Sequence, residues 1–204
     1  MLTLLFIINV AGTAAFAVSG ALLAAKKKMD WVGFVFIGNV TGIGGGTLRD
    51  VILDVPVFWL VDWYYVVICS VSAVITYFAT QQISRKSKAL LWADAIGMAL
   101  FSVLGAQKAL SLGAEIPVAV IMGVFSACLG GIIRDVILND VPVVFQKEIY
   151  ITASLLGAIA YCVCDSLLDI RGLYAVAIGC VVAFGVRALA ILTNLSMPAH
   201  RGLQ

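Results

Sequence analysis

A glycine cluster followed by Arg-Asp occurs twice in this chain, both times inside a long apolar segment. Residues 44–57 read GGGTLRDVILDVPV, and residues 130–143 read GGIIRDVILNDVPV. Ionisable side chains within a membrane-spanning segment are costly and usually mark a functional site. Glycines that interrupt a spanning helix expose backbone polar groups, which are tolerated only inside protein or along a water-filled cavity. The duplicated motif therefore predicts a pathway through a membrane protein built from two related halves.

The composition supports this interpretation. Of the 204 residues, 63% are hydrophobic and only 12% are charged, and the mean hydropathy is +1.11. Soluble domains are typically about 45–50% apolar. The formal net charge is only +2, and because no long basic run accompanies it, no nucleic-acid partner is predicted. We therefore expect an all-α integral membrane protein embedded in the lipid bilayer.

Seven segments are long and apolar enough to form a helix that crosses a bilayer, which needs about 20 residues. They are residues 3–25, 32–54, 63–83, 89–111, 116–138, 147–167 and 172–193. The second and fifth of these segments contain the motif. The first has no basic residue before it and three lysines directly after it, so we predict a retained helix rather than a cleaved signal peptide.

Basic and acidic residues fall on opposite sides of the predicted membrane. The first side receives Lys26, Lys27, Lys28, Arg85, Lys86, Lys88, Lys147 and Arg201. The second side receives Asp54, Asp62, Glu115, Asp165 and Asp169, with Arg171 as its basic residue. The positive-inside rule assigns the basic side to the cytoplasm. We therefore predict an N-terminus outside the cell and a cytoplasmic C-terminus.

The similarity extends beyond the motif itself. Each motif copy belongs to a repeat unit of three spans. Arg134 follows Arg49 by 85 residues, and the same offset relates Gly130 to Gly45. It also relates further pairs, namely Phe16 and Phe101, Gly20 and Gly105, Ala21 and Ala106, Gly38 and Gly123, and Asp50 and Asp135. After the motif we expect an offset of 86, with Asn139 as an insertion that aligns Asp54 with Asp140.

A repeat unit of three spans determines the topology. Because three is odd, the second unit enters the membrane from the opposite face, and the two halves become inverted repeats. We therefore predict a first three-helix repeat at residues 1–85 and a second, inverted repeat at residues 86–171. The remaining residues, 172–204, are predicted to form a seventh helix and a cytoplasmic tail.

The inverted three-plus-three repeat, the seventh helix and the duplicated pattern Gly-Gly-x-x-Arg-Asp-Val resemble the bacterial branch of the trimeric intracellular cation (TRIC) channel family. The resemblance covers nearly the whole chain, and the bacterial relatives also carry a glycine-transporter domain label. It implies a homotrimer in the bacterial plasma membrane. It further implies a pore in each protomer, bounded by kinked second and fifth helices, that conducts monovalent cations and chiefly potassium.

The motif and its surroundings define the predicted ion pathway and gate. From the second span these residues are Thr41, Gly44, Gly45, Gly46, Thr47, Arg49 and Asp50, and from the fifth span they are Ser126, Gly130, Gly131, Arg134 and Asp135. Glycine destabilises a helix by about 1 kcal/mol relative to alanine, so the clusters favour a kink or a short unwound stretch. Carbonyls released there suit a partly dehydrated cation. The alternative is that the glycines allow close helix packing.

Each motif arginine lies about one helical turn beyond its glycines. Because adjacent residues diverge by about 100° on a helix, we expect Arg49 and Arg134 to face away from the aspartates that follow them. Their partners are then expected on neighbouring helices or across the pseudo-two-fold axis. Either these charges form a structural ion pair between the halves, or they form a gate. For Asp94 the sequence offers two partners, Lys108 and Arg187, and does not choose between them.

Two functions remain open at this stage. The first is a potassium-permeable channel, and the second is a secondary transporter for a small amino acid such as glycine, whose carboxylate an arginine and helix N-termini would bind. The chain has no nucleotide-binding motif, no histidine-rich metal set and no nucleophile–base arrangement, so we expect neither an enzyme nor a cofactor. Potassium is the expected permeant ion, and the sequence identifies no metal site.

Overall fold

The computed structural model describes residues 2–80, 86–146, 148–170 and 172–196. Apart from an isolated β-bridge between Glu148 and Ser196, its regular structure is helical. The α-helices are α1 (Leu2–Lys26), α2 (Trp31–Ile52), α3 (Phe58–Val61), α4 (Tyr64–Ala79), α5 (Lys86–Ser111), α6 (Ile116–Ile137), α7 (Ile151–Cys162) and α8 (Leu173–Thr193). A 3-10 turn, η1 (Val143–Phe145), precedes α7, and a π-helical segment, η2 (Val163–Leu167), continues it.

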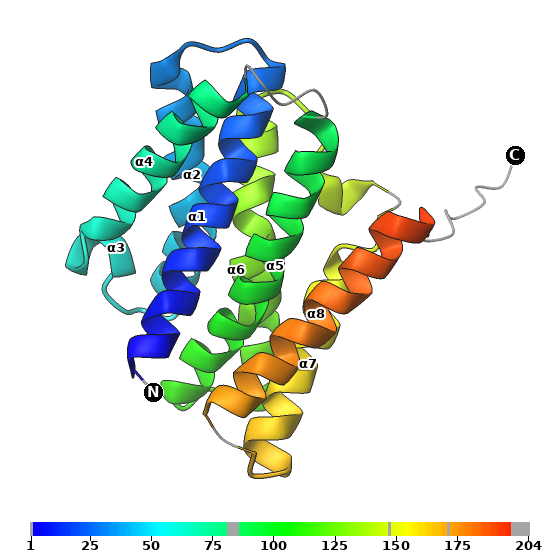
Figure 1. Cartoon of the computed structure of the whole chain (residues 1–204). Helices are drawn as coiled ribbons and strands as arrows, with labels where there is room; N and C mark the ends of the chain where they lie inside the picture. The colour runs from blue at the N-terminus through cyan, green and yellow to red at the C-terminus, as the bar shows by residue number, and fades with distance from the viewer. Residues whose placement is uncertain (1, 81–85, 147, 171, 197–204) are drawn as a thin grey trace, which may run out of the picture.

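The long helices lie side by side and alternate in direction (Figure 1). In that view α1 rises from the N-terminal end, α2 descends and α4 rises. The next group starts in the opposite sense, because α5 descends, α6 rises and α7 descends, and α8 then rises to the C-terminal end. The second group of three therefore runs opposite to the first, as an odd number of spans in each repeat requires.

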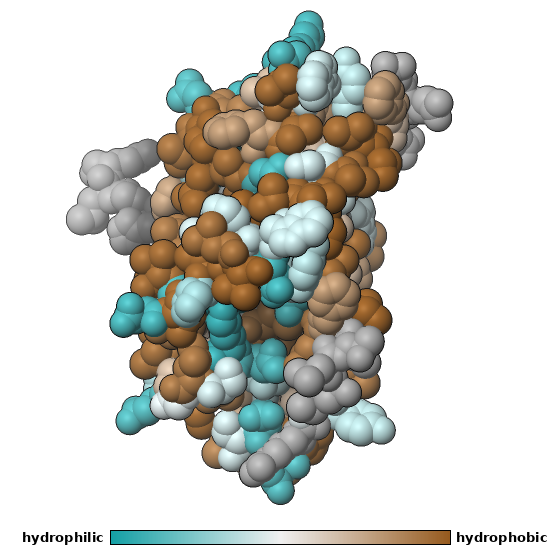
Figure 2. Space-filling model, turned by 90° about the vertical axis from the view of Figure 1, so that its left-hand side faces the viewer, coloured by the Kyte–Doolittle hydropathy of each residue, from teal (hydrophilic) through white to brown (hydrophobic). Residues whose placement is uncertain are grey.

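Every predicted span corresponds to a helix, although two are shorter than expected. Within the described residues, five helices are long and apolar enough to cross a membrane, namely α1, α2, α5, α6 and α8. The predicted span 63–83 contains the shorter helix Tyr64–Ala79, and the predicted span 147–167 contains Ile151–Leu167. Hydrophobic side chains cover much of the face seen from the left of Figure 1, as Figure 2 shows. Such a surface suits contact with lipid or with another apolar chain.

The charged loops lie at opposite ends of the bundle. The loop after α1, which contains Lys27 and Lys28, is at the upper end of Figure 1, whereas the α5–α6 loop with Glu115 is at the lower end. The upper end is not purely basic, because Asp140 lies there and its carboxylate is 2.6 Å from the Lys27 ammonium. Four residues used in the orientation argument, Arg85, Lys147, Arg171 and Arg201, lie outside the described residues.

Glycines allow α2 and α6 to cross in close contact. A Cβ atom on Gly45 would lie 2.3 Å from the carbonyl oxygen of Ser126, and one on Gly130 would lie 2.5 Å from the carbonyl oxygen of Thr41. Both distances are shorter than any side chain permits, so only glycine fits at these two positions without a shift of the backbone. The close-packing interpretation of these glycines is therefore confirmed.

The predicted unwound stretch is wrong for both helices. α2 is helical from Trp31 to Ile52 and α6 is helical from Ile116 to Ile137, so the helices continue through their glycines. Tertiary packing provides most of the stability of helices in proteins and outweighs the low helix propensity of glycine at this buried crossing. A bend in either helix remains a prediction.

The predicted insertion at Asn139 is also wrong. Asp54 and Asn139 each follow the last residue of their helix by two positions, and both adopt the left-handed conformation, with φ of 52° and 53°. In each copy the next backbone N–H bonds to the carbonyl of the motif aspartate, Asp50 at 3.0 Å or Asp135 at 2.8 Å. The offset of 85 therefore continues, because aspartate and asparagine both tolerate the left-handed turn.

Replacing either crossing glycine with alanine should destabilise the protein. We expect Gly45→Ala and Gly130→Ala to cost about 1–3 kcal/mol, because the added methyl group meets a backbone carbonyl that cannot rotate away. For a chain of this size that corresponds to a loss of roughly 2–4 °C in melting temperature per kcal/mol. Thermal unfolding of the purified protein in detergent measures the shift.

The matched control is Gly185→Ala in α8, where no heavy atom lies within 4 Å of the added Cβ. Alanine raises helix propensity there, so the melting temperature should stay the same or rise. Equal destabilisation at all three positions would contradict the assignment of the crossing to Gly45 and Gly130.

Candidate functional site

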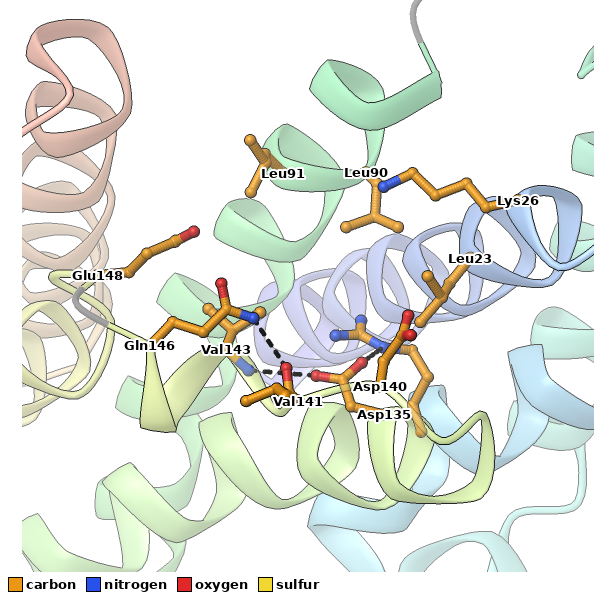
Figure 3. A pocket seen from close by; sticks show the side chains of 11 residues that line it. Leu23, Lys26, Leu90, Leu91, Asp135, Asp140, Val141, Val143, Gln146 and Glu148 are labelled. Atoms are coloured by element: carbon orange, nitrogen blue, oxygen red, sulfur yellow. Dashed lines mark hydrogen bonds and ion pairs between the residues drawn. The ribbon is translucent and has the colours of Figure 1, made fainter.

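A polar cavity lies at the upper end of the bundle and reaches the second motif arginine. We call it the upper cavity; its volume is about 350 Å³. Its lining residues are Leu23, Lys26, Leu90, Leu91, Arg134, Asp135, Asp140, Val141, Val143, Gln146 and Glu148 (Figure 3). Side chains from α1, α5 and α6 therefore meet the segment between α6 and α7 around one space. Carboxylates are prominent in this lining, since Asp135, Asp140 and Glu148 all contribute.

A second polar cavity lies at the lower end and reaches the first motif arginine. This lower cavity has a volume of about 190 Å³. It is lined by Asn9, Arg49, Phe58, Asp62, Tyr65, Leu104, Gln107, Lys108 and Ser111. The repeat offset relates the two cavities, because Arg49 corresponds to Arg134, Phe58 corresponds to Val143, and Lys108 corresponds to Leu23. The two motif copies therefore place a cavity at each end of the α2–α6 crossing.

Arg134 is buried in a network with two carboxylates. Its Nε donates to Asp135 Oδ1 at 2.7 Å, and its Nη1 donates to Asp94 Oδ1, also at 2.7 Å. The same Nη1 donates to Ser19 Oγ at 2.6 Å, and this hydroxyl donates to Asp94 at 3.0 Å. Arg134, Asp94 and Asp135 are each at most 3% exposed. Several charge-assisted hydrogen bonds therefore stabilise one buried guanidinium group.

Arg49 is equally buried but has a different set of partners. Its Nε donates to Asp50 Oδ1 at 2.8 Å, and its Nη1 reaches Ser126 Oγ at 3.4 Å. The ammonium of Lys108 donates to the same Asp50 oxygen at 2.7 Å, and the backbone N–H of Phe58 donates to Asp50 Oδ2 at 2.9 Å. The Arg49 guanidinium also lies over the Phe58 ring, 5.9 Å from its centroid. Two cations therefore share one carboxylate oxygen.

The expectation that each arginine faces away from the aspartate after it is wrong. In both copies the arginine Nε binds the neighbouring carboxylate directly. The 100° divergence describes where the Cβ atoms point, whereas the long arginine side chain can turn back around the helix. A nearby carboxylate strongly attracts a guanidinium in a buried site, and this favours the turned-back conformation. The expectation of partners on neighbouring helices is confirmed as well, since Arg134 also binds Asp94 of α5.

Both sequence-based candidates for the partner of Asp94 are wrong. Asp94 pairs with Arg134, whereas Lys108 pairs with Asp50 and Arg187 pairs with Glu148. Lys108 in the second repeat corresponds to Leu23 in the first, 85 residues earlier. The first repeat therefore has no charge at this position. α5 thus brings a carboxylate to the upper arginine and an ammonium to the lower one. This charge difference separates two sites that are otherwise related by the repeat.

The three hydroxyl residues predicted for the ion pathway, Thr41, Thr47 and Ser126, differ in their hydrogen-bond partners. The hydroxyls of Thr41 and Thr47 donate to carbonyl oxygens of their own helix, those of Ile37 and Ile43, each at 2.7 Å. Thr47 also accepts a hydrogen bond from the indole of Trp59 at 2.8 Å. Neither threonine lines the upper or the lower cavity. Ser126 differs, because its hydroxyl accepts from Arg49 and joins the lower arginine to α6.

The predicted glycines divide into those at the crossing and those beside it. Gly45 and Gly130 lie at the crossing, and Gly44 faces α6, where an added Cβ would be 3.3 Å from Ile133 Cδ1. Gly46 faces the Phe58 ring, with an added Cβ 2.6 Å from it. Gly131 lies under the guanidinium of Arg134, with an added Cβ 3.4 Å from Nη2. These last two glycines therefore make space for the aromatic and charged groups of the site.

Several residues of the upper site were not predicted. Ser19 and Asp94 are recognisable as polar residues within apolar segments, but their common contact with Arg134 depends on how α1, α5 and α6 pack. Gln146 lies between two predicted spans and Glu148 lies at the very start of the predicted span 147–167, where a polar residue is unremarkable. They line the cavity because the segment after α6 folds back over it (Figure 3). No local pattern in the sequence indicates that return.

Buried and exposed ion pairs should differ in their contribution to stability. We expect Asp94→Asn to destabilise the protein by about 3 kcal/mol, because it removes a carboxylate from a buried guanidinium. Asp140→Asn breaks the pair between Asp140, whose side chain is 41% exposed, and Lys27, whose side chain is 35% exposed. Because this pair is exposed, the substitution should cost only about 0–1 kcal/mol. Thermal unfolding of both variants in the same detergent tests this. Equal shifts would show that the buried network contributes no more than an exposed pair.

The repeated architecture is matched by a known family. The sequence model of the family described as Glycine transporter matches this chain twice, at residues 6–81 and at residues 91–166. The two matches start 85 residues apart, which is the offset between the motif copies. α8 lies outside both matches.

Three curated relatives of similar sequence are described as membrane proteins. The UPF0126 inner membrane protein YadS of Escherichia coli K12 is 39% identical over 197 residues, covering 96% of this chain and 95% of YadS. A UPF0126 membrane protein of Vibrio cholerae is 43% identical over 163 residues, covering 77% of this chain and 66% of that protein. A third, YvgT of Bacillus subtilis, is 32% identical over 155 residues, covering 75% of this chain and 77% of YvgT.

TRIC channels are among the solved structures that are similar to this chain. The TRIC trimeric intracellular cation channel orthologue from Rhodobacter sphaeroides has a TM-score of 0.89 and 42% identity, covering 95% of this chain and 100% of that chain. A prokaryotic TRIC channel has a TM-score of 0.89 at 28% identity, covering 95% of this chain and 98% of that chain. Since the family matches extend over more than half of the chain, this protein belongs to the glycine transporter family of membrane proteins and has the fold of the prokaryotic TRIC cation channels.

Proposed function

We propose that this protein is a homotrimeric channel for monovalent cations, chiefly potassium, with a separate pathway in each protomer between α2 and α6. The observation that carries the proposal is the pair of polar cavities at opposite ends of the bundle, each of which reaches a buried motif arginine. The similarity to solved TRIC channels over nearly the whole chain supports the same function. Polar cavities at opposite ends of a tight helix crossing are expected of a pathway with a closed centre.

The charges around the upper cavity favour cations. Arg134 is paired with two carboxylates, Asp94 and Asp135, so this group has more carboxylates than cations. Asp140 and Glu148 also line the cavity, but each is paired with a cation, Lys27 and Arg187, and Lys26 adds one more ammonium, so the excess of carboxylate is confined to the Arg134 group. Such an excess of one charge in a cavity with low-dielectric walls raises the local concentration of counter-ions. Cations would therefore collect at this end of the pathway.

The lower site is suited to closing the pathway. Arg49 and Lys108 together provide two cations for the single carboxylate of Asp50, while a second carboxylate, that of Asp62, lines the same cavity, so the excess of positive charge is local to Asp50. An excess positive charge at the end of a narrow path repels a permeant cation. Because both cations use the same oxygen of Asp50, one of them can leave while the other keeps the carboxylate paired. We propose that motion of these cations away from the crossing opens the path.

The position in the membrane follows from the helices and the loop charges. We place all seven long helices across the bilayer, with α4 and α7–η2 as the two shorter spans. YadS is described as an inner membrane protein, and we propose the same membrane for this chain. The upper end, which carries the α1–α2 loop lysines, would face the cytoplasm, so the N-terminus would lie outside and the C-terminus inside.

A secondary transporter for a small amino acid such as glycine is the competing function. The description of the matching family and the two buried arginines favour it, since a guanidinium binds a carboxylate well. However, the Nε atoms of both arginines are already engaged by aspartates. A substrate carboxylate would therefore have to displace a carboxylate of the protein. This competition favours the channel.

Single-channel recording in planar bilayers, under a potassium chloride gradient, distinguishes the two functions. A channel gives discrete unitary currents that reverse near the potassium equilibrium potential. A transporter gives silent bilayers, together with saturable glycine uptake into liposomes made from the same preparation. The second result would reject the channel and make Arg49 and Arg134 candidates for substrate binding.

Neutralising either motif arginine should change the gating of the channels that still fold, in addition to the loss of stability that follows when a buried carboxylate loses its cation. We expect Arg49→Gln and Arg134→Gln to raise the open probability and to weaken its voltage dependence, since one charge crossing the field corresponds to about 2.3 kcal/mol per 100 mV. The unitary conductance should change less. Lys28→Gln, in the exposed loop after α1, removes the same charge and should leave gating unchanged. Loss of the oligomer with unaltered gating of the remaining channels would contradict a gating role.

Cysteine labelling should reveal the orientation in intact bacteria. We expect Glu115→Cys, in the exposed α5–α6 loop, to react with a membrane-impermeant maleimide from outside the cell. Lys28→Cys should react only after the membrane is permeabilised. The native cysteines Cys69, Cys128, Cys162 and Cys164 are buried, and replacing Cys180, which is partly buried, removes the main background. Reversed labelling would overturn the proposed orientation.

A further inference from the structure

α8 has no counterpart in the two repeats, and it carries a buried arginine. Arg187 is 2% exposed, and its Nη2 donates to the carboxylate of Glu148. Its Nη1 donates to the carbonyl oxygen of Ile149 at 3.4 Å, and the guanidinium lies 5.2 Å from the centroid of the Tyr150 ring. All three partners lie directly before α7. Arg187 therefore connects α8 to the segment that leads into α7.

That segment also forms one wall of the upper cavity. We call residues 139–146 and 148–150 the α6–α7 connection. Five of its residues line the cavity, namely Asp140, Val141, Val143, Gln146 and Glu148 (Figure 3). The Gln146 side-chain amide donates to the Val141 carbonyl at 2.8 Å, so the connection is braced internally. A displacement of the connection would therefore change the shape of the upper cavity.

Asp135 links the α6–α7 connection to the motif arginine. Its Oδ2 accepts from the backbone N–H of Val143 at 3.3 Å, and its Oδ1 accepts from Arg134 Nε at 2.7 Å. The two oxygens of one carboxylate thus hold the connection on one side and the arginine on the other. Since a carboxylate is rigid, a pull on Val143 also changes the geometry at Arg134. Figure 3 shows both contacts as dashed lines.

The first repeat has the same carboxylate link but a different anchor. The backbone N–H of Phe58 donates to Asp50, and Trp59 donates to Thr47, so the anchors of this segment lie on α2 itself. The corresponding connection in the second repeat is tied instead to a helix outside the repeat, through Glu148 and Arg187. The difference between the halves therefore lies at the attachment of α8.

We infer that Arg187 and Glu148 are positioning residues that couple α8, through the α6–α7 connection and Asp135, to Arg134, the motif arginine of the upper site. This inference rests on the proposed channel function. The pair holds the connection against the upper cavity and keeps Asp135 aligned with Arg134, which favours the closed pathway. Movement of α8 then changes the stability of the closed state although α8 lines neither motif site.

The surroundings of Glu148 leave room for such movement. A third cavity, of about 260 Å³, lies on the α8 side and is lined by Leu91, Gln146, Glu148, Arg187, Ala190, Ile191, Asn194, Leu195 and Ser196. Glu148, Gln146 and Leu91 line both this cavity and the upper one. The Glu148 side chain therefore lies between two cavities and is not enclosed by close packing. It can exchange Arg187 for water without displacing a packed neighbour.

The test is Glu148→Gln in the full-length protein, recorded in planar bilayers. The substitution keeps the size of the side chain and removes its charge, so the buried guanidinium loses its carboxylate while the fold is retained. We expect an increase of threefold or more in open probability, with an unchanged unitary conductance. Glu115→Gln, an exposed carboxamide substitution at the other end of the bundle, is the matched control and should have no effect. Glu148→Asp, which keeps the charge, should restore part of the closed-state preference.

Hydrogen–deuterium exchange gives a readout that does not depend on current. Glu148→Gln should speed exchange in peptides that cover residues 138–150 and leave the α2 peptides unchanged. Unchanged exchange together with unchanged open probability in Glu148→Gln would overturn the inference. If the wild-type protein forms no channels, the proposed function fails by itself, and unchanged exchange in Glu148→Gln would still reject the anchoring role of the pair.

Discussion

A guanidinium group buried in an apolar helix bundle has to be neutralised within the protein, and this requirement organises both motif sites. Transfer of an isolated charge into such surroundings costs far more than a domain can compensate. Each arginine is therefore paired with the aspartate next to it, and further groups arrive from neighbouring helices. α5 provides a second carboxylate, Asp94, for the upper arginine, whereas at the lower site it provides a second cation, Lys108, which shares the Asp50 carboxylate with Arg49. The middle helix of the bundle thus determines how two sequence-related sites differ in charge.

The α2–α6 crossing brings those two sites into one structure. Since the contacts at Gly45 and Gly130 leave no room for a side chain, the two motif helices meet backbone to backbone at their glycines. Each arginine then lies about one turn from the crossing, on opposite sides of it. The inverted directions of α2 and α6 place the two arginines, and the two cavities, toward opposite ends of the bundle. A single repeat unit could not provide both halves of this arrangement.

Much of the fold was predictable because the relevant information is local. Apolar length identified the spans, the motif offset identified the repeat, and the odd number of spans per repeat implied its inversion.

The pairing of charges was not predictable to the same degree. The rule that neighbouring residues diverge on a helix ignores the length of arginine, and so it missed the contacts of Arg49 with Asp50 and of Arg134 with Asp135. The partners of Asp94 and Lys108 depend on helix packing, which one sequence does not contain. The predicted insertion at Asn139 was wrong because the sequences were aligned by identical residues, Asp54 with Asp140. The left-handed backbone conformation, which Asp54 shares with Asn139, sets the actual register.

The nature of the atoms that face each glycine limits how the chain can evolve. At Gly46 an added methyl group would meet the ring of Phe58, so a smaller residue at position 58 could make space for it. At Gly45 and Gly130 the opposing atoms are the carbonyl oxygens of Ser126 and Thr41, which every amino acid possesses. No second-site substitution can remove a backbone oxygen. Suppressor selections should therefore recover compensating changes for alanine at position 46 and none near the crossing for alanine at positions 45 or 130.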